Sequence, residues 1–215
     1  MERILCLAIG YLFGLFQTAY IYGRMNGIDI REYGSGNAGT TNALRVLGKK
    51  AGLIVFFGDV LKTILAVLTV QLLFGKTYAD IIALLRLYAA AGAILGHNFP
   101  CYLGFRGGKG VACTAGLIAT LGPIMIVCEA VTFLLVTGIT RYVSLGSIIV
   151  EIELVVMLVV LGQRGYYGMD QPHRIEFYIL AAALCAMAIW RHRKNIGRLL
   201  NGTESKVFQK KDERG

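Results

Sequence analysis

The sequence predicts an all-α, polytopic integral membrane protein: a bundle of seven transmembrane helices, two of them short, with the amino terminus outside and the carboxyl terminus in the cytoplasm. The first reason is composition, because 56% of the 215 residues are hydrophobic and only 16% are charged, against about 25% charged in an ordinary globular domain. The second is a series of apolar stretches, several of which reach the roughly 20 residues that a membrane helix needs. The third is the clustering of basic residues between these stretches. This composition excludes intrinsic disorder, and the long apolar stretches argue against a soluble nucleic-acid-binding protein despite a net charge of +9.

The predicted spans are, in order, 4–22, 51–74, 79–96, 111–121, 124–138, 147–161 and 175–190. The fourth and fifth come from one apolar run that Gly122 and Pro123 interrupt. Proline breaks a helix interior and a Gly-Pro step favours a turn. The run is therefore predicted to form two short helices, the first only about 16 Å long. Without this break the number of spans would be five or six.

Basic residues predict the sidedness of the spans, because cytoplasmic loops of membrane proteins are enriched in Lys and Arg. The segment 24–50 holds five of them, and the segment from residue 191 to the carboxyl terminus holds eight. Placing both segments in the cytoplasm requires an odd number of spans. With seven spans, 16 of the 22 basic residues lie on the cytoplasmic side; a bundle of five spans is the alternative.

The rest of the chain gives few signs of a second domain or of a metal site. Residues 1–206 are predicted to form one membrane domain, followed by a polar tail at 207–215. The five cysteines are scattered without a CxxC pair or a histidine at ligand spacing, so they are interpreted as packing residues, with no metal and no cofactor. Among the charged residues inside the spans, Asp59 and Lys62 are three apart and can form a structural ion pair. No role is predicted for the others, namely Arg86, Glu129, Glu151 and Glu153.

The loop after the first span is rich in glycine and in hydrogen-bonding side chains. It reads Gly-Ser-Gly-Asn-Ala-Gly-Thr-Thr-Asn-Ala-Leu-Arg over 34–45. Glycines allow close backbone approach and N–H groups that converge on an anion, and Arg45 offers a guanidinium that can bind phosphate or carboxylate with two hydrogen bonds. A flexible linker is the alternative, but it would not need the Thr, Asn and Arg side chains. The loop is therefore predicted to bind an anion.

Two further segments offer donors on the same side of the membrane. The first of them reads Gly-His-Asn-Phe-Pro over 96–100 and Gly-Phe-Arg-Gly-Gly-Lys-Gly over 104–110, and it opens directly into the span at 111. A glycine-rich turn before a helix places free N–H groups and a cation where phosphate binds. It is not a Walker A loop, because Gly110 and Val111 follow Lys109 where that motif needs Ser or Thr. In the segment 190–204, His192 and Asn195 are predicted to share a helix face. Taken alone, that segment also fits the basic flank of a last span.

These three segments resemble the PlsY-type family of bacterial acyl-phosphate:glycerol-3-phosphate acyltransferases. The resemblance covers residues 4–206 and keeps the family's three signature regions in order. It implies a seven-helix enzyme of the bacterial inner membrane whose active site faces the cytoplasm. The implied reaction transfers a fatty acyl group from acyl phosphate to glycerol 3-phosphate, giving 1-acyl-glycerol-3-phosphate (lysophosphatidic acid) and phosphate, the first acylation of phospholipid synthesis. It implies membrane lipid as the surroundings, with no nucleic acid, obligate protein partner or cofactor.

The resemblance also implies roles for individual residues. The implied catalytic residues are Ser35, Arg45, Lys109, His192 and Asn195. The implied substrate-binding residues are Gly36, Asn37, Gly39, Thr41, Asn42, Gly107, Gly108, Gly110 and Ser147. Glu204 is implied as a structural acid.

The residues themselves also favour direct transfer from an activated donor. The chain has no GxSxG nucleophile motif, and no histidine is followed at the fifth position by aspartate, the pair on which other acyltransferases depend. Two general bases therefore remain open: His192, whose ordinary pKa suits the task, or the phosphate of the donor, which is the preferred interpretation. A transporter of organic phosphate is the main competing class, but it should show internal repeats and midplane sites. A structural scaffold would leave the glycine-rich loops unexplained.

Overall fold

The computed structural model describes residues 1–207, and in these residues it contains ten α-helices and two short 3₁₀ helices. The predicted tail falls outside the described residues, except for Val207. The helices are α1 Glu2–Gly14, α2 Thr18–Met25, α3 Thr40–Leu47, α4 Lys49–Phe74, α5 Ile82–Asn98, α6 Val111–Leu121, α7 Pro123–Thr140, α8 Val143–Gln163, α9 Gln171–Arg191 and α10 Arg193–Leu200, with 3₁₀ turns η1 at Ile30–Glu32 and η2 at Cys101–Leu103. The all-α prediction is confirmed.

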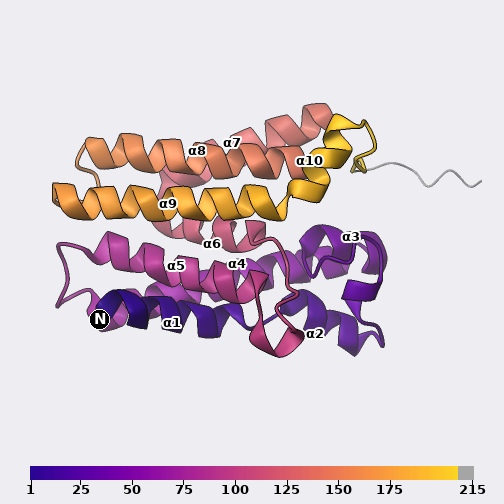
Figure 1. Cartoon of the computed structure of the whole chain (residues 1–215), viewed down its shortest axis with the longest axis horizontal. Helices are drawn as coiled ribbons and strands as arrows, with labels where there is room; N and C mark the ends of the chain where they lie inside the picture. The colour runs from indigo at the N-terminus through magenta and orange to yellow at the C-terminus, as the bar shows by residue number, and fades with distance from the viewer. Residues whose placement is uncertain (208–215) are drawn as a thin grey trace, which may run out of the picture.

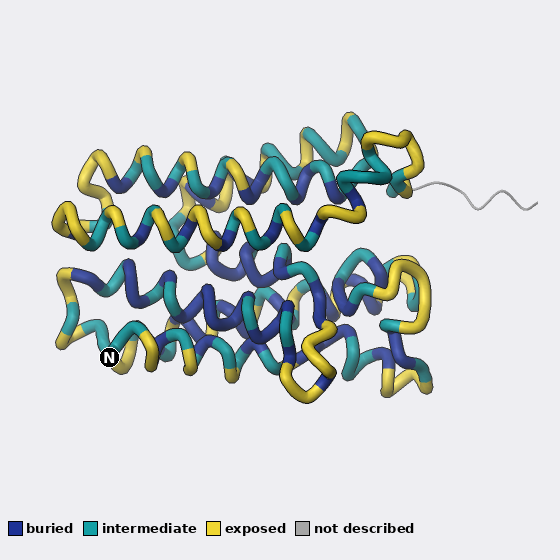
Figure 2. The backbone as a smooth tube through the Cα atoms, viewed as in Figure 1, coloured by how far each residue is buried: buried dark blue, intermediate teal, exposed yellow. Residues whose placement is uncertain are grey.

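The long helices lie roughly side by side, with α1, α4 and α5 on one side, α8 and α9 on the other, and α6 between them (Figure 1). The short helices α2, α3 and α10 gather at one end, which we call the polar end. The opposite, far end carries the short connections at 75–81 and 164–170. Helix α5 is the most enclosed, whereas α7 lies at the edge of the bundle with most of its surface exposed (Figure 2).

Six stretches of helix are long and apolar enough to cross a membrane, and α6, with 11 residues, is a shorter apolar helix beside them. The prediction that the second half of the interrupted run is also short is wrong, because α7 has 18 residues. The break does occur where it was predicted. Gly122 has a φ of +114°, and Pro123 is the first residue of α7. Proline is tolerated at that position because its missing N–H would have had no partner there, so it starts a full-length helix.

The contact between α1 and α5 is the closest in the bundle. Gly10 and Gly14 of α1 face Gly92 and Gly96 of α5, and a Cβ placed on any of the four would collide with backbone of the opposite helix. Small residues spaced by four let membrane helices approach until their backbones touch. This contact fixes the carboxyl end of α5, which leads into the glycine-rich loop at the polar end.

Helix α6 crosses only part of the bundle, and a cavity of about 370 Å³ lies at its carboxyl end, next to Tyr166 and Tyr167. Arg86 of α5 also lines this cavity, and its guanidinium donates a hydrogen bond to the carbonyl of Thr120 in the last turn of α6. A cation at a helix carboxyl terminus satisfies free carbonyls and complements the helix dipole. The structure thus gives Arg86 a role that the sequence left open.

Candidate active site

The glycine-rich loop before α6 is held by backbone on one side and by an arginine on the other. The N–H groups of Gly107 and Gly108 donate to the carbonyls of Asn98 and His97, at 3.2 and 3.1 Å. The guanidinium of Arg191 donates to the carbonyls of both glycines. The loop is therefore fixed before it reaches Lys109.

Gly110 ends this loop and turns the chain into α6. Its φ is +91°, a value that favours glycine, and a Cβ there would lie 3.1 Å from the side-chain oxygen of Asn98. Among residues 1–207, no side chain caps the first turn of α6. The N–H groups of that turn are consequently free to bind an anion.

Lys109 begins a chain of polar contacts that joins the loop to α10. Its ammonium donates to the side-chain oxygen of Asn195, whose amide nitrogen donates to Oε1 of Glu204 at 2.6 Å. Glu204 also accepts from Ser144 at 2.8 Å and from Arg198 at 2.6 Å. Through these contacts its carboxylate joins α8 to α10; its role as a structural acid stays a prediction.

Burial and neighbouring charges shift the pKa values of Lys109 and Glu204 in this series of contacts. Burial lowers the pKa of Lys109 to about 8; the carboxylate of Glu204 opposes this, while the nearby cations Arg198, Arg191 and Arg45 add to it. Burial also acts to raise the pKa of Glu204, but its hydrogen bonds from Asn195, Arg198 and Ser144 outweigh burial and hold that pKa below its ordinary value. The polar end thus keeps a carboxylate and a lysine close to its titration point.

His192 lies at the junction of α9 and α10 and is 2% exposed. Its Nδ1 lies 2.8 Å from the carbonyl of Ala188, an atom that can only accept, so Nδ1 carries the proton and Nε2 is an acceptor. Burial and the charge of Lys109 lower the pKa of His192 to about 4. The imidazole is therefore neutral at neutral pH.

The first glycine-rich loop is braced from within. The side-chain oxygen of Asn42 accepts from the N–H of Ser35 at 2.8 Å, and its amide nitrogen donates to the carbonyls of Ile30 and Tyr33. Asn42 is 1% exposed, so in this structure its amide organises the loop; its role in binding substrate stays a prediction. Ser35 and Arg45 are exposed at the surface of the polar end.

The other predicted binding residues differ in how far they are available. Gly36 has a φ of +70°, and Gly39 is the residue before α3, where Thr41 lies in the first turn. The hydroxyl of Ser147 donates to the carbonyl of Val143, one turn earlier in α8. Asn37 is half-buried in the loop between Gly36 and Gly39. The structure therefore links Lys109, Asn195 and Glu204 directly and holds Gly107 and Gly108 in one loop, while the roles of all the predicted site residues stay predictions.

Three residues that organise the site were not predicted. Arg191 belongs to the basic flank of the last predicted span, but its guanidinium holds the second loop. Arg31 pairs with Asp29 at 2.7 Å and donates to the carbonyl of Leu103 at 3.1 Å, which connects the first loop to the second. A basic residue next to an acidic one in a loop is too common a pattern to reveal such contacts from the sequence.

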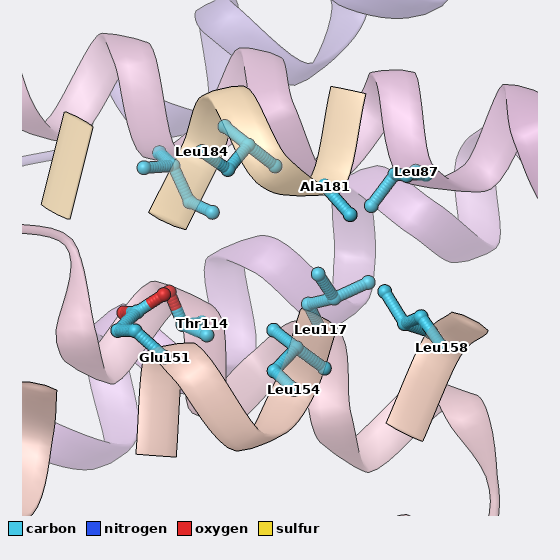
Figure 3. Close-up of a pocket in the computed structure, with 9 residues that line it drawn as sticks. Leu87, Thr114, Leu117, Glu151, Leu154, Leu158, Ala181 and Leu184 are labelled. Atoms are coloured by element: carbon cyan, nitrogen blue, oxygen red, sulfur yellow. The ribbon is translucent and has the colours of Figure 1, made fainter. Parts of the chain in front are cut away.

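A small seam lies between α5, α6, α8 and α9 (Figure 3). It is lined mainly by leucines, with Thr114 and Glu151 at one end, where their oxygens face each other. Its void of about 10 Å³ holds at most one water molecule. The seam is too small for a fatty acyl chain. Within residues 1–207 no group of three or more His, Cys, Asp or Glu side chains is arranged to hold a metal ion.

Comparison with known proteins decides the family. Residues 4–202 match the family described as glycerol-3-phosphate acyltransferase. The chain belongs to the glycerol-3-phosphate acyltransferase family. A glycerol-3-phosphate acyltransferase of Clostridioides difficile (strain 630) is 43% identical over 212 residues, covering 97% of each chain. One of Thermoanaerobacter sp. (strain X514) is 41% identical over 211 residues, covering 98% of each.

Solved structures of a relative agree with this assignment. The crystal structure of PlsY, an integral membrane glycerol 3-phosphate acyltransferase, in its glycerol 3-phosphate form, is 32% identical, with a TM-score of 0.82 over 97% of this chain and 100% of that one. Its lysophosphatidic acid form is 31% identical, with a TM-score of 0.80 over 96% of each chain. The protein is therefore an integral, multi-pass membrane enzyme of phospholipid synthesis, a glycerol-3-phosphate acyltransferase, as the sequence predicted.

Proposed function

We propose that this acyltransferase uses acyl phosphate as its donor and releases 1-acyl-glycerol-3-phosphate and inorganic phosphate. The observation that carries the proposal is the uncapped amino terminus of α6 beside Lys109, because free N–H groups and a cation there suit the phosphate of the acceptor, glycerol 3-phosphate. Arg45 and Arg191 lie close enough to lower the pKa of Lys109, so cationic groups surround this position. The two related structures hold glycerol 3-phosphate and lysophosphatidic acid, which supports the same acceptor and product for this enzyme.

The transfer needs no covalent acyl-enzyme, since a mixed anhydride is already activated. A hydroxyl oxygen of glycerol 3-phosphate attacks the acyl carbonyl carbon, the new C–O ester bond forms, and the bond from that carbon to the phosphate oxygen breaks. The departing phosphate takes the hydroxyl proton, so the donor itself serves as general base. Ser35, Arg45 and Lys109 stabilise the negative charge that develops, while Gly36, Asn37, Gly39, Thr41, Gly107, Gly108, Gly110 and Ser147 contribute to substrate binding.

His192 and Asn195 position the acceptor in this proposal. The neutral imidazole presents Nε2 as an acceptor, and Nδ1 is held by Ala188, which fixes the ring. A hydrogen bond from the acceptor hydroxyl to Nε2 would orient it without full proton transfer, because a group with a pKa of about 4 is a weak base. This favours substrate assistance over His192 as the base.

We also propose that the chain spans the bacterial inner membrane seven times, with its polar end in the cytoplasm. Helix α6 runs from the polar end to the cavity near Tyr166 and is apolar along its 11 residues, so we count it as a short span. Counting α6 as a span makes the total odd, which keeps the basic segments 24–50 and 191–206 on one side. The small seam beside Leu158 does not admit an acyl chain, which favours a chain that stays against the lipid-facing surface.

Purified enzyme, acyl phosphate and labelled glycerol 3-phosphate test the reaction. Labelled lysophosphatidic acid and one equivalent of phosphate are expected, and product formed from acyl-CoA or acyl carrier protein but not from acyl phosphate would overturn the donor.

The same assay with His192→Gln tests the base. A modest loss with an unchanged acid limb of the pH profile is expected, whereas complete loss with intact substrate binding would make His192 the base. The variant Arg141→Cys tests the topology. Labelling of this cysteine in intact cells by a reagent added outside would overturn the seven-span topology.

A further inference from the structure

A buried polar network lies directly beneath the loop 107–109 and takes no part in the mechanism above. Lys62 of α4 is its centre, and its side chain is 4% exposed. The ammonium lies 2.7 Å from Oδ1 of Asp59, 2.8 Å from the carbonyl of Phe16 and 2.9 Å from Nδ1 of His97. Thr18 donates to the same oxygen of Asp59 at 3.0 Å. The ion pair predicted from the spacing of residues 59 and 62 is therefore confirmed, but it has a third member.

The geometry determines which nitrogen of His97 carries the proton. An ammonium has three N–H groups and no lone pair, and here the three groups have three acceptors. Nδ1 of His97 must accept, so the proton of the neutral ring sits on Nε2. The pair of Asp59 and Lys62 thus sets both the ring orientation and the tautomer of His97.

The opposite edge of the His97 ring lies against the two glycine-rich loops. A Cβ on Gly108 would collide with Nε2 of His97 and would lie 2.8 Å from the carbonyl oxygen of Ala38. Ala38 belongs to the first glycine-rich loop and Gly108 to the second. His97 is 3% exposed and therefore fills the junction at which the two loops touch.

The backbone of His97 is held as firmly as its ring. Its carbonyl accepts from Gly108 at 3.1 Å and from the side-chain amide of Gln17 at 3.2 Å. Gln17 also donates to the carbonyls of Gly14 and Gly96, at the closest contact between α1 and α5. The ring thus connects rigid helices to the two loops.

We propose that His97 is a positioning residue for the acyl transfer: held by Lys62 and Asp59, it fixes the contact between the two glycine-rich loops and so places Lys109 and the start of α6 on the phosphate of glycerol 3-phosphate. This inference rests on the proposed role of the second loop in phosphate binding. Its distinctive consequence concerns the acceptor, because a displaced loop weakens binding of glycerol 3-phosphate more than it weakens the fold.

His97→Asn is the direct test, since asparagine keeps an acceptor near Lys62 but does not reach Gly108. The KM for glycerol 3-phosphate should rise about tenfold or more, as expected for a misplaced binding group, while the KM for acyl phosphate changes little. The matched control is Arg86→Met, which removes a half-buried cation at the other end of the same helix. It should lower thermal stability without changing either KM.

A second variant tests the proposal without leaving an unpaired buried charge that could unfold the protein. Asp59→Asn combined with Lys62→Met removes both charges together, so that neither is left buried and unpaired. This double variant should also raise the KM for glycerol 3-phosphate. Adding His97→Asn to it should cause no further rise, because the three residues act through one contact.

Three outcomes would decide against the proposal. Unchanged KM values in His97→Asn together with lower stability would make the network purely structural. Equal changes in the KM values for glycerol 3-phosphate and acyl phosphate would show that His97 does not act on the acceptor specifically. Additive effects of His97→Asn and the Asp59/Lys62 double variant would show that His97 does not act together with Lys62. If Lys109→Met also leaves the KM for glycerol 3-phosphate unchanged, the proposed phosphate site itself fails. If only the His97 and Lys62 variants are silent, that site stands and this inference alone is overturned.

Discussion

The two ends of α6 carry similar groups in opposite electrostatic settings. At the carboxyl end, the guanidinium of Arg86 meets the free carbonyl of Thr120, an arrangement in which the cation and the helix dipole attract each other. At the amino end, Lys109 stands beside free N–H groups, where the dipole opposes a positive charge. The first arrangement is complete in itself. The second is completed by an anion, which is why we place substrate phosphate there and none at the far end.

The largest effect that would test this contrast is expected from Lys109→Met. Loss of a charged donor from the transition state costs a factor of about one hundred or more in kcat/KM, and the variant should retain its fold because Asn195 keeps Glu204 as a partner. Steady-state kinetics with glycerol 3-phosphate as the varied substrate measure this. A loss of less than about threefold would remove Lys109 from the site.

Glu204→Gln should produce the next largest effect. It removes the charge that pairs with Arg198 and replaces one of the two acceptor oxygens by an amide donor, so kcat/KM should fall about tenfold, in line with about 1.5 kcal/mol for a hydrogen bond to a charged group. Ser144→Ala breaks one contact of the same carboxylate and serves as the graded control. If Ser144→Ala is the more damaging variant, the carboxylate is not the organising group.

The pH dependence of kcat/KM should follow the charge of Lys109. The pKa of Lys109 is lowered to about 8, so the cation is present below that value and is lost as the pH rises through it. Because kcat/KM reports the free enzyme, it should decline on the alkaline side through about pH 8. Lys109→Arg should move the decline to higher pH, since a guanidinium stays charged. An unchanged alkaline limb in that variant would assign the decline to another group.

Arg86→Met should have the smallest effect on catalysis and a measurable one on stability. Loss of the bond to Thr120 costs about 1 kcal/mol, which corresponds to a few degrees in the thermal midpoint for a chain of this size. Thermal inactivation in detergent measures the shift, and kcat/KM measured below the midpoint should be unchanged. A loss of activity as large as that of Lys109→Met would mean that the two ends of α6 are not independent.

The sequence predicted the helical fold because apolar stretches and basic clusters are local signals. It also located the break at Pro123 but misjudged the length that follows, since Pro123 suits the start of a helix as well as its interruption. The contact of Lys109 with Asn195 could not be predicted, because 86 residues separate them and only the packing of α5, α6 and α9 brings their ends together. The same holds for His97 and Lys62, where a helix spacing revealed the pair but not its third member.

The glycine contact between α1 and α5 has a consequence for how the enzyme fails. Where glycine backbones touch, as at Gly10, Gly14, Gly92 and Gly96, there is no side chain that could repack into an alternative register. A small separation of the two helices therefore removes the support of Gln17 and His97 together. As heat or detergent loosens the bundle, we expect each molecule to pass from fully active to inactive in one step, so that a partly inactivated sample holds fewer active enzymes with an unaltered affinity for glycerol 3-phosphate.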